Sequence, residues 1–213
     1  MKKVIILAIA SLIGGASYAQ STVKFGLKGG VSLPKYQFKQ VDGKDPDTKT
    51  TTNFHVTGYA DAPLSSMFSI QPGISLQGKG GKYIDNNNLQ AEQNTLWIEV
   101  PVNFVAKLPL GTGKGTNLFL GAGPYAGFGI SGENKLTTNN AETKSDISFG
   151  DDSGDNLKGT DFGVNFLGGF QMGSGFTLGA GYGMGLTDLR PGGSGGNGKQ
   201  TNRVWSFSAG FLF

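Results

Sequence analysis

The chain contains no cysteine, only one histidine and, after Gln20, no apolar run of 18 or more residues. Without cysteine there can be no disulfide and no lipid attached to an N-terminal cysteine. A lone histidine in a chain without cysteine also argues against a zinc site. A helix that crosses a membrane needs about 18 or more apolar residues, so the region after Gln20 predicts no spanning helix.

The N-terminus has the pattern of a cleavable secretory signal peptide. Met1-Lys2-Lys3 is basic and Val4–Ile13 is apolar. Ser17-Tyr18-Ala19 then places small residues at the two positions that signal peptidase recognises. We therefore predict a signal peptide over residues 1–19 and one mature domain over residues 20–213.

The basic character of the full chain belongs largely to this leader. Loss of Lys2 and Lys3 lowers the 18 basic residues to 16, against 15 acidic ones, so the formal charge falls from +3 to +1. A chain so close to neutrality has no electrostatic signature of nucleic-acid binding. We expect no nucleic-acid partner.

Apolar residues alternate with small or polar ones in many parts of the mature chain, and this period of two predicts β-strands. Eight segments show it: Val23–Leu33, Asn53–Ala62, Met67–Gln77, Thr95–Leu108, Asn117–Ser131, Asp161–Met172, Phe176–Thr187 and Arg203–Phe213. Long polar connections (Pro34–Thr52, Gly78–Asn94, Gly132–Thr160 and Asp188–Asn202) alternate with short ones. Outer-membrane barrels have this asymmetry, with long extracellular loops and short periplasmic turns.

The two faces of these segments differ in a way that indicates a membrane. In Phe176–Thr187 the apolar face carries Phe176, Leu178 and Tyr182, while the other face is mainly glycine. A soluble barrel would instead carry lysine and glutamate along its solvent face. We therefore predict an all-β fold, an eight-stranded antiparallel up-and-down transmembrane β-barrel, whose narrow lumen is filled by side chains. A secreted β-sandwich is the disfavoured alternative.

The last strand segment is an aromatic one. Trp205, Phe207, Phe211 and Phe213 share its apolar face, and such a terminal aromatic strand resembles the signal by which the outer-membrane assembly machinery recognises its clients. We expect outer-membrane lipid and the barrel assembly machinery as partners, the latter during biogenesis.

A few ionisable side chains fall on the inward face and predict a polar network in the lumen: Lys24, Lys28, His55, Asp61, Glu99 and Lys107. Buried charges must be paired to be tolerated. We predict an ion pair between Lys24 and Asp61 on neighbouring strands, and a second contact in which Glu99 reaches toward Lys28. Such a network is either a structural plug, the favoured interpretation, or a path for protons or ions.

Three short motifs occur in an order that resembles a known family. Val100-Pro101 lies in one strand, Gly123-Pro124 in the next, and Gly185-Leu186-Thr187 near the end of the seventh. This order is similar to that of the PorT-like outer-membrane β-barrel domain family. The resemblance covers essentially the mature chain and implies a barrel in the outer membrane of a Gram-negative cell, without a catalytic motif.

Motifs for catalysis and metal binding are sparse. His55 could form a dyad with a loop residue such as Ser148 or Asp146, although a histidine in an interior polar network is commoner. The acidic segment 146–156 could offer oxygen ligands to Ca²⁺, but its spacing is not that of an EF-hand loop. We predict no catalytic residue, no cofactor and no metal site.

Three functions stay open at this point. The first is a barrel with a filled lumen whose structural or interaction role is carried by its extracellular loops and an unidentified protein partner. The second is a small pore or ligand conduit, which a filled eight-stranded lumen disfavours. The third, more remote, is a barrel enzyme that uses His55.

Overall fold

The computed structural model describes residues 22–40, 48–85, 89–111, 115–139, 141–152, 154–192 and 198–213. The described residues form nine strands: β1 (Lys24–Gln40), β2 (Asn53–Pro63), β3 (Phe68–Asp85), β4 (Leu89–Pro109), β5 (Asn117–Thr138), β6 (Ala141–Asp146), β7 (Thr160–Gln171), β8 (Phe176–Gly185) and β9 (Gly198–Leu212). None of their segments is a helix of the length and apolarity that a membrane crossing requires. The segment 1–19 lies outside the described residues, so its cleavage stays a prediction.

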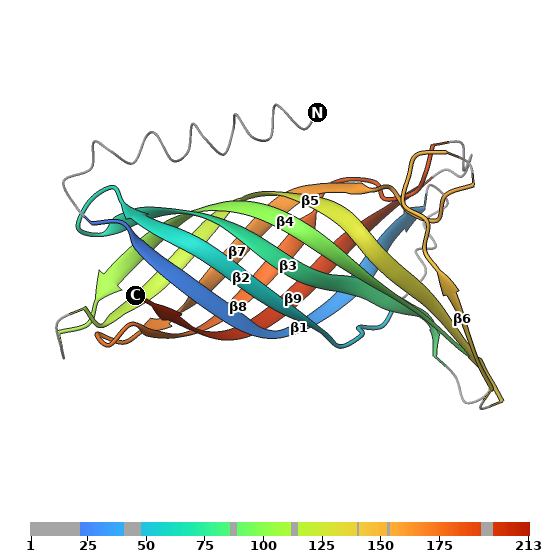
Figure 1. Ribbon diagram of the computed structural model, residues 1–213, viewed down its shortest axis with the longest axis horizontal. Helices are drawn as coiled ribbons and strands as arrows, with labels where there is room; N and C mark the ends of the chain where they lie inside the picture. The colour runs from blue at the N-terminus through green and yellow to red at the C-terminus, as the bar shows by residue number, and fades with distance from the viewer. Residues whose placement is uncertain are drawn as a thin grey trace.

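Eight of the nine strands close into a ring (Figure 1). The order is β4-β3-β2-β1-β9-β8-β7-β5, and pairing of β4 with β5 completes it. All neighbours are antiparallel, and β6 pairs with β5 outside the ring. Closure gives every strand of the ring a partner on both sides, as a hydrocarbon environment demands. The predicted eight-stranded barrel is confirmed.

The outer surface of the ring is apolar, as the alternation predicts. On β1, Phe25 and Leu27 are 67% and 53% exposed. Farther along, Leu33 lies opposite Trp205, and the next outward pair is Lys35 with Arg203. The change from apolar to basic side chains marks the edge of the lipid-facing band at the end of β1 far from Lys24, where charged residues become tolerable.

The ends of the barrel differ as predicted. The connections at 64–67, 110–116 and 172–175 are short and lie at the end where Lys24 and Leu212 are found (Figure 1). The long connections lie at the opposite end. By the rule for outer-membrane barrels, the short turns face the periplasm and the long connections face the outside.

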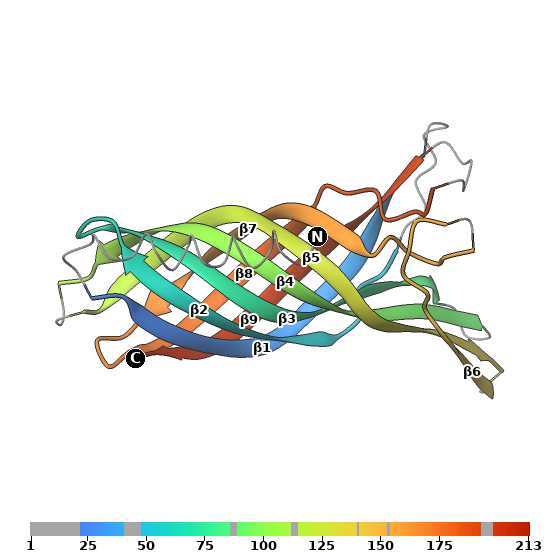
Figure 2. The same cartoon turned by 45° about the horizontal axis from the view of Figure 1, so that its top comes forward.

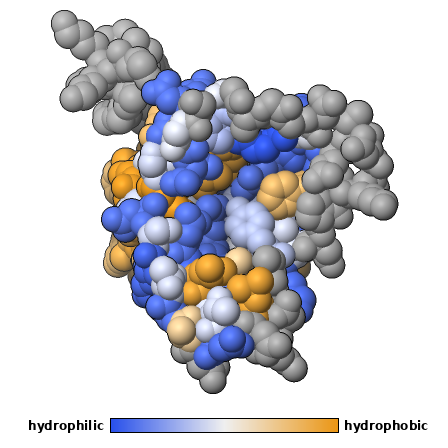
Figure 3. Space-filling view, turned by 90° about the vertical axis from the view of Figure 1, so that its right-hand side faces the viewer, coloured by the Kyte–Doolittle hydropathy of each residue, from blue (hydrophilic) through white to orange (hydrophobic). Residues whose placement is uncertain are grey.

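The regions predicted as long loops contain more β-structure than expected. β3, β4 and β5 are 18, 21 and 22 residues long, while a crossing needs only about 10. Their outer parts join β6 in a sheet that projects beyond the barrel, and β1 and β9 extend as a separate ribbon (Figure 2). Backbone pairing continues there although the hydrophobic alternation stops, so the pattern alone ended the strands too early. The extracellular end that carries this sheet is mainly hydrophilic, with smaller apolar patches (Figure 3).

Candidate functional site in the barrel interior

The inward face of the barrel encloses a polar cavity of about 100 Å³. One side is formed by charged and polar side chains of β1 to β4, and the other by residues of β5 and β7 together with the glycines and serines of β8 and β9. Its principal lining residues are Lys28, His55, Thr57, Tyr59, Gln77, Lys79, Glu99, Asn103, Lys107, Gly179, Gly181, Ser206 and Ser208. Side chains leave this cavity in the middle of the barrel, and the filling of the lumen as a whole stays a prediction.

A buried ion network crosses the interior near its extracellular end. Lys79 Nζ lies 2.5 Å from Glu99 Oε1 and 2.7 Å from Asp161 Oδ2. Tyr125 Oη and Asn202 Nδ2 also donate to Asp161 Oδ2, at 3.1 and 2.9 Å. The network thereby joins β3, β4, β5, β7 and β9. Its side chains are almost entirely removed from solvent, where an ammonium needs carboxylate partners.

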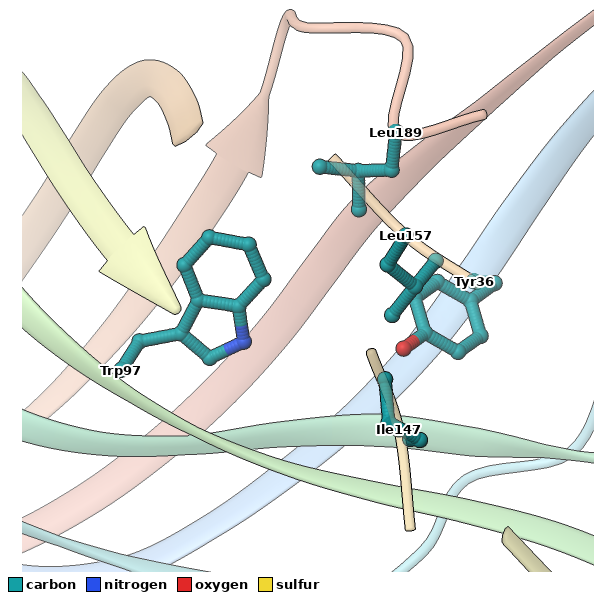
Figure 4. Packing of buried hydrophobic residues seen from close by; sticks show 5 residues of the cluster. All are labelled: Tyr36, Trp97, Ile147, Leu157 and Leu189. Carbon is teal, nitrogen blue, oxygen red and sulfur yellow. The ribbon is translucent and has the colours of Figure 1, made fainter. Parts of the chain in front are cut away.

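An apolar cluster continues this closure outward (Figure 4). Trp97 connects the apolar cluster to the ion network, because the centre of its ring lies 5.2 Å from Lys79 Nζ. The buried side chains of the cluster converge from β1, β4 and the two connections that flank β7 and β8: Tyr36, Trp97, Ile147, Leu157 and Leu189. Each is at most 7% exposed. The connections around 147–157 and 189 thus cover the mouth of the barrel.

Backbone hydrogen bonds hold these covering segments in place. Ile147 N donates to Gly132 O at 2.9 Å, which fastens the first segment to β5. Leu189 N donates to Gln200 O, and Lys158 N donates to Leu189 O, both at 2.8 Å. The second segment is therefore joined both to β9 and to the first segment, so the cover has a defined conformation.

A second ion pair lies nearer the periplasmic end. Asp61 Oδ2 accepts from Lys107 Nζ, and Asp61 Oδ1 accepts from Gln71 Nε2 at 3.1 Å. Lys24 lies directly opposite Asp61 on the neighbouring strand. The predicted Lys24–Asp61 ion pair is wrong, because Lys24 is exposed at the strand end while Lys107 reaches Asp61 across the interior.

The second predicted contact, between Glu99 and Lys28, is also wrong. Glu99 pairs with Lys79, a residue that the sequence pattern assigned to an external loop. Lys28 remains in the cavity, and its ammonium lies 5.7 Å from the centre of the Tyr59 ring. Four of the six predicted lumen residues thus lie at the cavity wall: Lys28, His55, Glu99 and Lys107. A fifth, Asp61, is paired with Lys107.

His55 is buried and makes its contacts inside the barrel. Its Nδ1 lies 3.0 Å from Ser32 Oγ, and Ser32 Oγ accepts from Gln77 Nε2 at 2.8 Å. Neither suggested dyad partner contacts it. Ser148 instead donates to Asp155 in the exposed acidic loop. The arrangement is an interior polar network and not a dyad at the external rim.

The acidic loop is bonded within itself and to the connection between β8 and β9. Asp155 Oδ2 accepts from Asp152 N at 3.0 Å, and Asp151 Oδ1 accepts from Gly192 N at 2.9 Å. Among the residues that the structure describes, no group of three or more histidine or acidic side chains is arranged to hold a metal.

The aromatic residues of the last strand all face the lipid. Trp205, Phe207 and Phe213 are 52%, 53% and 72% exposed, and Phe211 is 39% exposed. Their outward position is as predicted, while their recognition by the assembly machinery stays a prediction.

Lys79 and Asp161 are the charged residues of this interior network that the sequence pattern did not predict. Lys79 lies in the polar run Gly78-Lys79-Gly80-Gly81-Lys82, which has no apolar alternation. Asp161 could have been predicted from the alternation. It is at the start of a strand segment whose other face is apolar, so its side chain has to point inward.

A closed antiparallel ring with a lipid-facing apolar surface and a polar interior defines a transmembrane β-barrel protein. A family model described as outer membrane protein beta-barrel domain matches residues 18–190. The chain belongs to this family, and its location is the cell outer membrane. The closer resemblance to PorT-like barrels stays a prediction.

Solved structures with similar folds are distant in sequence. The attachment invasion locus protein Ail of Yersinia pestis is 12% identical, with 91% of this chain and 100% of that chain covered and a TM-score of 0.44. Neisserial surface protein A is 11% identical, with 90% and 98% covered and a TM-score of 0.43. OprG from Pseudomonas aeruginosa is 10% identical, with 89% and 95% covered and a TM-score of 0.48. No curated protein matches the chain by sequence, and similarity at these levels carries no argument about role.

Proposed function

We propose that this protein is a closed, non-enzymatic outer-membrane barrel whose role is an interaction carried by its extracellular part. The observation that supports this function best is the double closure of the outer end. The Lys79 network crosses the interior, and the Trp97 cluster covers it. Solutes cannot diffuse through an interior that is occluded by packed side chains.

The extracellular part offers a surface for such an interaction. The six residues of β6 are exposed, and their outer edge has no paired strand among the described residues. Ion pairs join β6 to β5, as between Lys135 Nζ and Glu142 Oε2 at 2.7 Å. A sheet with one free edge and a charged face can present both backbone and side-chain groups to a protein partner.

A small pore is the second candidate, and the polar cavity favours it. In this alternative the Lys79 network and the Lys107–Asp61 pair are gates at the two ends of the cavity. Opening would require both the ion network and the apolar cluster to separate. The closed interior is therefore the better-supported state.

Conductance across a planar bilayer separates the two candidates. We expect the purified barrel to leave the bilayer silent, because both closures persist in the folded protein. The double variant Trp97→Ala and Lys79→Ala removes both closures and shows whether the assay can detect an opened interior. Lys135→Ala on the exposed sheet is the matched control and should stay silent. Stable channels of uniform size from the unmodified protein would reject the closed barrel in favour of the pore.

The interaction is tested with a photo-crosslinking residue placed at Thr143 on β6 in living cells. The matched control carries the same residue at Leu64, in a short turn at the opposite end. We expect a discrete crosslinked product from Thr143 that is absent from Leu64. Equal products, or none at Thr143 while the barrel is fully folded, would contradict a role for this sheet.

A further inference from the structure

Lys28 is the cavity lysine that has no carboxylate partner among the described residues. Lys79 is held by Glu99 and Asp161, and Lys107 is held by Asp61. The contact of Lys28 is instead the face of the Tyr59 ring, 5.7 Å from its ammonium. An aromatic face offsets only a small part of the cost of burying an ammonium.

His55 adds a second donor to the same part of the cavity. Gln77 Nε2 donates to Ser32 Oγ, which leaves the Ser32 hydroxyl proton free to donate to His55 Nδ1. Gln77 also donates to its neighbour's carbonyl, Gly78 O, at 3.0 Å, which fixes the orientation of its amide. We assign His55 the tautomer in which Ser32 Oγ donates to Nδ1 and the proton of the neutral imidazole is on Nε2.

The wall that faces these donors leaves room for a ligand. Gly179, Gly181 and Gly183 on β8 carry no side chains, and Ser206 and Ser208 on β9 add only hydroxyl groups. Phe119 takes up part of the space beside Gly179, since a Cβ atom there would lie 3.5 Å from its ring, and the cavity is the space that remains. Asn103 also lines the cavity, is 7% exposed, and has an amide oxygen without a hydrogen-bond partner. An amide can turn its N–H₂ toward a ligand in place of its oxygen.

We infer that the cavity binds a small monovalent anion, of the size of chloride, between the Lys28 ammonium and the His55 Nε2–H. The anion neutralises Lys28 and accepts from His55. The carboxylates at Lys79 do not serve this purpose, since both are held within 2.7 Å of Lys79 Nζ. A cavity of about 100 Å³ accommodates a halide or a very small carboxylate, and gluconate is much larger than either. The inference does not depend on whether the barrel conducts.

The first test is thermal. The temperature at which the compact form of the barrel disappears on a gel is measured in sodium chloride and in sodium gluconate at equal ionic strength. We expect chloride to raise this temperature by several degrees, because an anion that binds only the folded protein stabilises it. Lys28→Met should abolish the difference. Lys24→Met is the matched control on the same face of β1 but exposed, and it should keep the difference.

The second test uses the unmodified protein, so that it holds even if the Lys28 variant fails to fold. Crystals grown in sodium bromide should show an anomalous peak in the cavity beside Lys28 Nζ and His55. Bromide peaks confined to the outer surface would overturn the inference. So would a chloride response that is missing from the unmodified protein or that persists in Lys28→Met.

Discussion

At the scale of single residues, the outer end of the barrel depends on one lysine with two carboxylate partners. Lys79 is 1% exposed and also lies 4.6 Å from the centre of the Tyr125 ring. A buried charge group of this kind adds little net stability compared with an apolar replacement of the whole group. Removal of the cation alone leaves carboxylates that have no counter-charge.

We predict that Lys79→Met destabilises the folded barrel by about 3–5 kcal/mol, because Glu99 and Asp161 are left buried and unpaired. Urea unfolding of the barrel in lipid vesicles measures the change. The control is Lys144→Met, whose pair with Glu133 at 3.5 Å is solvent-exposed and should matter little. Equal effects of the two substitutions would show that the interior network is not a stabilising element.

Close approach of neighbouring strands gives a second prediction at this scale. A Cβ atom at Gly30 would lie 1.9 Å from Phe207 O, and one at Gly123 would lie 1.9 Å from Val102 O. At Gly58 no atom lies within 4 Å of such a Cβ. We expect Gly30→Ala and Gly123→Ala to cost at least about 1–3 kcal/mol each through forced backbone movement. The yield of heat-modifiable barrel measures this, and Gly58→Ala should match the unmodified protein.

At the scale of the strands, β9 has a special place because it closes the ring. It pairs with β8 on one side and with β1 on the other. β6, in contrast, pairs with β5 alone. Loss of β9 would open the sheet within the membrane, while loss of β6 would remove only an external extension.

Deletion of residues 205–213 should therefore prevent barrel assembly, because β1 and β8 would keep unpaired backbone groups in lipid. Replacement of residues 134–146 by a short Gly-Ser turn should leave assembly intact. Protease protection of the membrane fraction distinguishes the two results. A folded barrel without residues 205–213 would contradict the assignment of β9 as the closing strand.

The connection between β8 and β9 gives a prediction about pH. Partial burial acts to raise the pKa of Asp188, but hydrogen bonds from Gln200 N and from Arg190 outweigh it and hold this pKa below its ordinary value. A lowered pKa in the folded state means stabilisation that is present above the unfolded value of about 3.9 and is lost as the pH falls below it.

We expect residues 186–192 and 198–203 to loosen as the pH falls below about 3.9 toward the folded pKa of Asp188. Hydrogen exchange of this segment, corrected for the intrinsic pH dependence, measures the loosening. Asp188→Asn should exchange faster at pH values above the folded pKa of Asp188 and should lack this acid-dependent step. An identical pH profile in the variant would assign the step to another group.

At the scale of the whole molecule, the closed ring predicts how the purified protein behaves on a gel. A barrel whose strands are all paired resists detergent at room temperature and migrates as a compact species. We expect the band to shift to a slower position after boiling. A variant that lacks residues 205–213 should show a single position with and without boiling, which makes it the matched control.

The sequence was sufficient to predict the ring because lipid on one side and a polar lumen on the other impose alternation along each crossing. The pattern ended at the membrane, so it missed the outer ends of β3, β4 and β5. It also missed the contact between Lys79 and Asp161, which lie 82 residues apart on strands that are not neighbours in the ring. Alternation shows which side chains point inward, but contacts across the interior depend on depth and on ring closure. For the same reason the sequence predicted Lys24, on the neighbouring strand, as the partner of Asp61, while the actual partner is Lys107 across the interior.

The projecting sheet has a practical consequence. A strand advances about 3.3 Å per residue, and β5 is 22 residues long, roughly twice what a crossing needs. Thr138 and Ala141, the outermost pair of β5 and β6, therefore stand well outside the bilayer on a support of paired strands (Figure 2). A short foreign peptide grafted at this tip would be held away from the lipid and within reach of antibodies on intact cells, so the barrel could serve as a scaffold for surface display.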